Sequence, residues 1–119
     1  MLFEQGDLIE LSFDPTVGHE PQKRRPALVV SVGHFNNVVS SVVVVCPITS
    51  AANKHPLHIE LPDGLPMKGY VCMEAMRALD LNNPGRAARH LDSYVDHETM
   101  SKVLDAIGAV FDNHPLIRW

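Results

Sequence analysis

The alternation of apolar and polar residues predicts a series of short β-strands in the first two thirds of the chain. Residues 8–13 alternate strictly, which is typical of a half-buried strand. Residues 27–32 and 41–46 are almost entirely apolar and mostly β-branched, so they are expected to be buried strands. Pro47 follows the second of these runs and is expected to end it.

Three more strands are predicted further along the chain. Residues 57–61 alternate and indicate a strand with one solvent-facing side, residues 70–73 form another apolar run, and residues 75–79 suggest a short last strand. The composition of residues 62–66 predicts a turn, and residues 33–37 are expected to turn the chain through one helical turn.

After residue 96 the spacing of apolar residues becomes helical, and Asp96 is a suitable N-cap. The predicted apolar face of this helix consists of Met100, Val103, Leu104, Ile107, Val110 and Phe111. Five or more short strands followed by one amphipathic helix predict a mainly β domain, a small antiparallel barrel or sandwich that the helix plugs or flanks. Antiparallel pairing is expected because no crossover helices separate the strands.

Length, charge and cysteine usage narrow the possibilities. A chain of 119 residues is expected to be a single domain spanning residues 1–119. The net charge is −4, but residues 18–58 carry four basic side chains and one acidic, which fits a confined site for a polyanion.

Cys46 and Cys72 lie in apolar runs and are expected to be buried free thiols. With no signal peptide or membrane-spanning segment in the pattern, a cytoplasmic protein is expected.

The junction between a polar loop and a strand at residues 18–31 is the strongest local signal of a site. Pro26 lacks an N–H group, so it is expected at the first residue of the strand or on an edge, and it favours an extended Arg25. A guanidinium held on a strand can donate two parallel hydrogen bonds to one phosphate. The alternative is an ordinary solvated arginine beside an edge proline.

No motif for a cofactor is present, and no metal is expected. His55 and His58 are three residues apart, but the sequence offers no third ligand near them. Polar residues do collect at predicted strand ends: His19, Glu20, Arg25, Thr49 and Glu74. Such a set matches metal-free RNA cleavage, which needs an acid, a base, and fixed donors for the charge that develops on phosphorus.

Four ordered motifs resemble the MazF/PemK (Kid) family of toxin–antitoxin ribonucleases. They lie in residues 6–20, 25–31, 35–36 and 46–50, and the similarity covers roughly residues 5–112. The resemblance implies an SH3-like barrel with a C-terminal helix, a homodimer, and metal-independent, sequence-specific cleavage of single-stranded RNA that leaves a cyclic phosphate. It also implies a cognate antitoxin whose extended acidic tail occupies the RNA groove.

Carried over by position, the resemblance assigns the family's Arg-Pro arginine to Arg25 and the Pro-x-Thr threonine to Thr49. His19 and Glu20 match the family's Gly-His-Glu loop. Glu74-Ala75 replaces the Asp-Gln of many members, and Cys72 stands where Kid-type proteins carry an arginine, whereas Arg77 matches a basic family position. A scheme based on Arg25 and Thr49 is therefore favoured.

The candidate catalytic residues are His19, Arg25 and Thr49. The candidate substrate-binding residues are Glu20, Lys23, Arg24, Ser50, Lys54, Glu74 and Arg77. Three of them have a structural alternative: His19 can bond the loop backbone, Glu20 can pair with a neighbouring cation, and Thr49 can cap the turn after Pro47. Phe35 and Asn36 are interpreted as structural.

Two functions fit this pattern. The first is an endoribonuclease toxin in which Arg25 stabilises the phosphorane, Thr49 positions the phosphate and His19 acts as acid or base. The second is a non-catalytic toxin on the same barrel that binds and inhibits a protein target such as gyrase.

Overall fold

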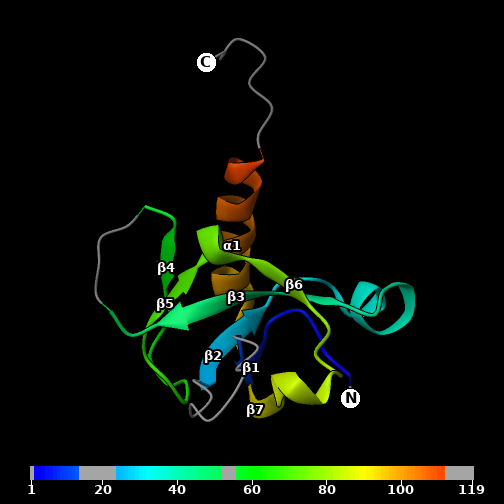
Figure 1. The fold of residues 1–119 in the computed structure, drawn as a ribbon. Coiled ribbons are helices and arrows are strands. Elements are labelled where there is room, and N and C mark those ends of the chain that lie inside the picture. Colours follow the sequence, from blue (N-terminus) through cyan, green and yellow to red (C-terminus); the bar gives the residue numbers. More distant parts are fainter. Residues whose placement is uncertain (1, 14–23, 52–55, 112–119) are drawn as a thin grey trace.

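The computed structural model describes residues 2–13, 24–51 and 56–111, which form one antiparallel β-sheet and a C-terminal helix (Figure 1). The strands are β1 (Asp7–Ser12), β2 (Arg24–Val29), β3 (Val43–Thr49), β4 (His58–Glu60), β5 (Tyr70–Cys72), β6 (Arg77–Leu79) and β7 (Arg89–Tyr94). The helical elements are the π-helix η1 (Phe35–Val39), the 3₁₀ turns η2 (Met73–Ala75) and η3 (Pro84–Arg86), and the α-helix α1 (His97–Val110). This arrangement confirms the predicted mainly β fold and the helical turn after residue 32.

The strand order is β4-β5-β3-β2-β1-β7, with β6 also paired to β3. β3 pairs with β6 through Val43–Val45 and with β5 through Ile48 and Thr49, so it passes from one neighbour to another along its length. In the described part of the chain β4 and β7 end the order, and the sheet is barrel-like without being closed.

β1 is buried on both of its faces, so the prediction of a half-buried strand was wrong. Leu8 packs in one hydrophobic cluster, while Ile9 and Leu11 pack in a second cluster on the other face. Ser12 is also fully buried. The physical reason is that each face of β1 is covered by a hydrophobic cluster. The cluster around Leu8 includes Met100 of α1, and the cluster around Ile9 and Leu11 includes Phe3 and Leu79.

Both strand prolines lie inside their strands, which corrects the predicted boundaries. Pro26 is the third residue of β2, at a point where β2 pairs with β1 but its pairing with β3 has not begun. Pro47 does not end β3, which continues to Thr49. It lies between the residues that pair with β6 and those that pair with β5, where a missing N–H group interrupts neither ladder.

β7 was not predicted, because its charged residues give little β-strand signal. It pairs with β1, and the register shifts between Leu8 and Ile9. Asp92 adopts a positive φ of 53° within the irregular part of β7. A bulge of this kind bends a strand, and it lets β7 follow the curl of the sheet into α1.

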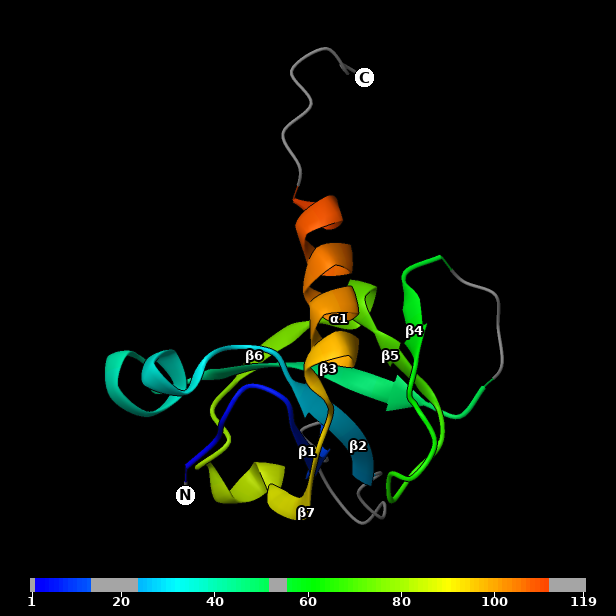
Figure 2. The ribbon, with the colours of Figure 1, turned by 180° about the vertical axis from the view of Figure 1, so that it is seen from behind.

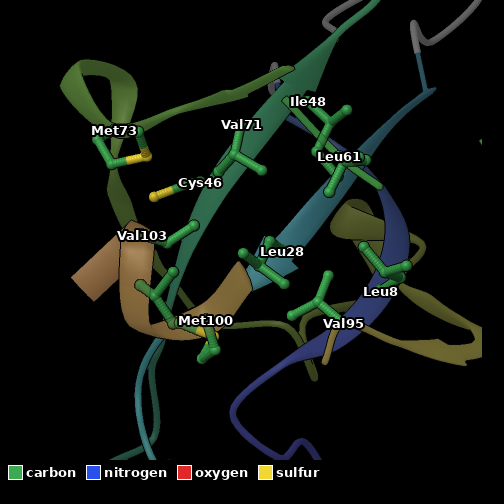
Figure 3. Packing of buried hydrophobic residues seen from close by; sticks show 11 residues of the cluster. Leu8, Leu28, Cys46, Ile48, Leu61, Val71, Met73, Val95, Met100 and Val103 are labelled. Atoms are coloured by element: carbon green, nitrogen blue, oxygen red, sulfur yellow. The ribbon is translucent and has the colours of Figure 1, made fainter. Parts of the chain in front are cut away.

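α1 begins at the predicted cap, where the Asp96 carboxylate accepts a hydrogen bond from the Thr99 N–H at 3.4 Å. Its N-terminal half packs on the sheet through Met100 and Val103, beside Leu28, Cys46 and Val71 (Figure 3). The rest of the predicted apolar face is only partly covered: Ile107 packs against the core cluster, whereas Leu104, Val110 and Phe111 are exposed. The C-terminal part of the helix extends away from the sheet (Figure 2). Within the described ranges, no helix combines the length and apolar character needed to cross a bilayer.

Candidate functional site

The pairing of β2 with β3 brings the two strongest predicted site residues together. Ala27 lies opposite Pro47, and these are the last paired residues at this end of the two strands. Continuing this register by two residues along each strand puts Arg25 opposite Thr49, on the same face of the sheet. Arg25 is exposed at this point, so its side chain is accessible to a ligand.

The same face continues over β5 and β4. Thr49 lies opposite Tyr70, and on the next pair of strands Cys72 lies opposite His58 and Tyr70 opposite Glu60. Residues directly opposite each other project to the same side of a sheet. We call this set the polar row: Arg25, Thr49, Tyr70, Cys72, His58 and Glu60. The other side of these strands carries the apolar residues Leu28, Cys46, Ile48 and Val71, which pack against α1.

The Cys72 thiol is surrounded by predicted site residues. Burial is the main cause that raises its pKa, and the Glu74 carboxylate raises it further. The backbone N–H of Thr49 and the charge of Arg25 lower it. Arg25, Thr49 and Glu74, which come from three separate elements, therefore all act electrostatically on one thiol. Cys46 is buried on the apolar side, where burial above all raises its pKa to about 12, and both cysteines are free thiols, as predicted.

Thr49 is held in place by its own turn and by the start of β5. Its Oγ1 accepts a hydrogen bond from the Ala51 N–H at 3.2 Å, which is the turn-capping contact considered as its alternative role. The hydroxyl can still donate its proton to a ligand. Gly69 lies against Thr49, and a Cβ atom there would be 2.5 Å from the Thr49 carbonyl oxygen. Gly69 is thus required for the close approach of β5 to Thr49.

His58 and Glu74 form a short polar contact beside the thiol. His58 Nε2 lies 2.7 Å from Glu74 Oε2, and the His58 side chain is largely buried. The ligand atoms of His58, Cys72 and Glu74 all lie within 4.8 Å of one another. Sequence reasoning noted His58 but missed this cluster, because its members meet only through the pairing of β4 with β5.

A small cavity of about 290 Å³ adjoins the polar row at Tyr70. Ser50, one of the predicted binding residues, lines it together with Glu60, Asp63 and Lys68. A hydrogen bond to the Glu60 carboxylate, supported by its charge, raises the pKa of Tyr70. Tyr70 and Lys68 were not predicted as site residues, and the sequence gives no signal for them beyond their closeness to the predicted strand at 70–73.

Arg24 occupies the opposite face of β2 from Arg25. Its Nε donates to Glu10 Oε1 at 2.8 Å, and Arg89 donates to the same oxygen at 3.1 Å. The hydrogen bond from Arg24 is the main cause that lowers the pKa of Glu10. Although Arg24 and Arg25 are neighbours in sequence, Arg24 has a structural partner and Arg25 faces Thr49.

Arg77 and Arg86 converge on the end of β1. The Nη1 atoms of Arg77 and Arg86 donate to the Phe13 carbonyl oxygen at 3.0 and 2.6 Å, and the Arg77 guanidinium lies 5.9 Å from the centre of the Phe13 ring. These contacts hold the point where the chain enters residues 14–23. They place the Arg77 guanidinium against Phe13, outside the polar row.

Four predicted site residues, His19, Glu20, Lys23 and Lys54, lie outside the described residues. Asn36 is buried and structural, as interpreted: its side chain donates to the carbonyls of Phe3 and Ser31 at 3.0 and 2.9 Å. The polar row, with Glu74 beside it, therefore defines the candidate site in the described part of the chain.

The fold described above is also found in known proteins. Residues 4–111 match the model of the PemK-like, MazF-like toxin of type II toxin-antitoxin systems. The chain belongs to this family, which confirms the resemblance inferred from its motifs.

Individual relatives agree with this assignment. The chain is 36% identical over 118 residues to the endoribonuclease toxin ChpB of Escherichia coli, covering 92% of this chain and 95% of ChpB. The structure of MazF from Deinococcus radiodurans matches with a TM-score of 0.79 and 32% identity, covering 93% and 97% of the two chains. A MazE-MazF structure from the same organism matches with a TM-score of 0.76 and 29% identity, covering 93% and 96%.

Proposed function

We propose that this protein is the toxin of a type II toxin–antitoxin system and a sequence-specific endoribonuclease acting on single-stranded RNA. Family membership and relatives named as endoribonucleases support this function. The observation that carries the assignment to a site is the register of β2 and β3, whose continuation puts Arg25 opposite Thr49 where the strands stop pairing.

In the proposed reaction, the 2′-hydroxyl of the RNA attacks the adjacent phosphorus atom. The bond from phosphorus to the 5′-oxygen breaks, which leaves a 2′,3′-cyclic phosphate on one product and a 5′-hydroxyl on the other. Negative charge grows on the non-bridging oxygens as the attack proceeds, so donors aimed at these oxygens lower the barrier. One group must accept the hydroxyl proton and another must protonate the leaving oxygen.

Arg25 is the proposed donor to the non-bridging oxygens. Its side chain starts from a strand and is exposed, so the guanidinium can meet a phosphate with two N–H groups. An arginine stays protonated at neutral pH, which makes electrostatic stabilisation its role. Thr49, opposite Arg25 when the register is continued, is proposed to position the phosphate by donating its hydroxyl proton.

His19 is proposed as the acid or base, because an imidazole exchanges protons near neutral pH. Glu20, Lys23, Ser50 and Lys54 are proposed to contact the flanking nucleotides. The position of Ser50 supports this role, because Ser50 lines the cavity that adjoins the polar row at Tyr70.

The experiment is to incubate the protein with a long mixed-sequence RNA in excess EDTA. Cleavage at a limited set of sequences is expected, with cyclic phosphate ends identified by mass spectrometry, because the proposed chemistry uses protein groups alone. An intact RNA in EDTA, with cleavage restored by a divalent ion, would contradict the metal-independent mechanism. An RNA that stays intact under every condition would favour the non-catalytic inhibitor of a protein target.

The proposed partners are a second copy of the chain and an antitoxin with an extended acidic segment. The basic character of residues 18–58 favours an acidic segment that competes with RNA. Sedimentation is expected to give the mass of two chains, and an acidic antitoxin peptide should compete with RNA and bind less tightly as salt rises. A single-chain mass at micromolar concentration would refute the dimer, and salt-independent inhibition by a peptide that leaves RNA binding unchanged would refute the shared groove.

A further inference from the structure

His58, Cys72 and Glu74 offer a nitrogen, a sulfur and an oxygen atom around one point. The pairing of β4 with β5 puts His58 directly opposite Cys72, and Glu74 follows two residues later in η2. His58 Nε2 or Nδ1, Cys72 Sγ and a Glu74 oxygen lie within 4.8 Å of one another. Backbone pairing therefore fixes two of the three side chains, and the short turn after β5 supplies the third.

We propose that these three side chains bind one zinc ion, with a fourth position open to water. Bonds of about 2.0 Å to nitrogen and oxygen and about 2.3 Å to sulfur put tetrahedral ligand atoms roughly 3.3–3.6 Å apart. The 2.7 Å contact between His58 and Glu74 then has to lengthen by about 0.6 Å, which rotation of the exposed Glu74 side chain allows. The thiol proton of Cys72 leaves to solvent when the sulfur binds the ion.

The surroundings suit an ion that enters from one side. The His58 side chain is 6% exposed and Cys72 is 9% exposed, whereas the Glu74 side chain is 38% exposed. Glu74 thus forms the open side of the cluster. A thiolate and an imidazole select zinc over magnesium or calcium, which prefer oxygen ligands.

Zinc bound here joins the edge strand β4 to β5 and η2. β4 has three residues and, among the described strands, pairs with β5 alone, so a shared ion adds a link at the end of the sheet. The proposal does not rest on the endoribonuclease function, and the zinc has no part in the cleavage chemistry proposed above. Its readouts are spectroscopic and thermal, so its failure leaves the RNA assay in EDTA unaffected.

The experiment is a cobalt titration of reduced, EDTA-treated and desalted full-length protein. Cobalt is expected to give one equivalent of a tetrahedral site with a sulfur-to-cobalt charge-transfer band, which zinc displaces and magnesium does not. Cys72→Ser should abolish the charge-transfer band. Cys46→Val is the matched control, since it removes the other thiol with a side chain of similar volume, and it should keep the band.

Glu74→Gln removes the exposed ligand and is expected to fold normally. It should weaken cobalt binding at least about tenfold, and the control His97→Gln, at an exposed histidine of α1, should leave it unchanged. Zinc at a hundredfold excess over its dissociation constant should raise the melting temperature of the wild type by about 10 °C. A wild type with neither the band nor the thermal shift overturns the proposal. So does a charge-transfer band that survives Cys72→Ser or is lost in Cys46→Val.

Discussion

Replacing Arg25 with alanine tests the proposed site most directly. Arg25 is exposed on β2, so its removal should change the free energy of unfolding by no more than about 0.5 kcal/mol. If Arg25 donates to the phosphoryl oxygens in the transition state, its loss should lower the cleavage rate by about 10²–10³-fold, or roughly 2.7–4 kcal/mol. Arg25→Lys should recover only part of this loss, because an ammonium group lacks the two-pronged geometry.

Arg24→Ala is the matched control, and the structure predicts the opposite behaviour for it. Arg24 pairs with Glu10 at 2.8 Å, with side chains 30% and 26% exposed, so its loss should cost about 0.5–1 kcal/mol of stability. That corresponds to a fall in melting temperature of about 2–5 °C. Arg24 faces away from Thr49, so the chemical step should change little.

The assay is single-turnover cleavage of a short RNA under saturating enzyme, with circular dichroism melts of each variant. The expected result is a crossed pattern: Arg25→Ala loses rate and keeps stability, whereas Arg24→Ala loses stability and keeps rate. A folded Arg25→Ala that cleaves at the wild-type rate would refute the role given to Arg25. Loss of rate in Arg24→Ala alone would mean that the two arginines have exchanged faces.

Two further predictions follow from the packing around the site. Gly69→Ala should destabilise the protein by about 1–3 kcal/mol and slow cleavage, because the added Cβ would clash with the Thr49 carbonyl. Gly64→Ala is the control, since Gly64 also has a positive φ but open space around it. In the same melts and assay it should cost less stability and leave the cleavage rate unchanged. The pKa of Glu10 is lowered in the folded state, chiefly by the hydrogen bond from Arg24. The ion pairs of Glu10 therefore stabilise the protein fully above the unfolded pKa of about 4.3. This contribution is lost as the pH falls through the folded pKa. In urea titrations between pH 7 and pH 3, Glu10→Gln should flatten this acid-side fall in stability, and an unchanged pH profile would refute the assignment.

Local sequence pattern was sufficient to predict most of the elements. The β-branched run around Leu28 and Val29 and the Asp96 cap each produced the predicted strand or helix start, because local propensity and burial agree there. β7 was missed because it carries Arg89, His90 and Asp92, and its strand conformation comes from pairing with β1. The exposed end of α1 shows the same limit, since a periodic apolar face indicates a helix without showing how much of it is covered.

The candidate site could be predicted only where one short motif carries the information. Arg25 directly precedes Pro26 and Thr49 lies two residues after Pro47, each in a recognisable motif, and both belong to the polar row. The cluster of His58, Cys72 and Glu74 depends on which residue of β4 faces which residue of β5. His58 and Cys72 are 14 residues apart in the sequence, and this spacing does not show that they face each other. The ligands that join His58 could therefore not be found from the sequence.

The core determines which of the two adjacent arginines faces Thr49. Side chains alternate along a strand, so a slip of β2 by one residue against β1 would exchange the faces of Arg24 and Arg25. Such a slip would also move Leu28 out of the cluster that it shares with Leu8, and Ala27 out of the cluster that it shares with Ile9. It would separate Arg24 from Glu10 as well. Because the large buried Leu28 and the small buried Ala27 fit opposite sides of the sheet, hydrophobic packing fixes the register, and the register presents Arg25 as the cation of the polar row.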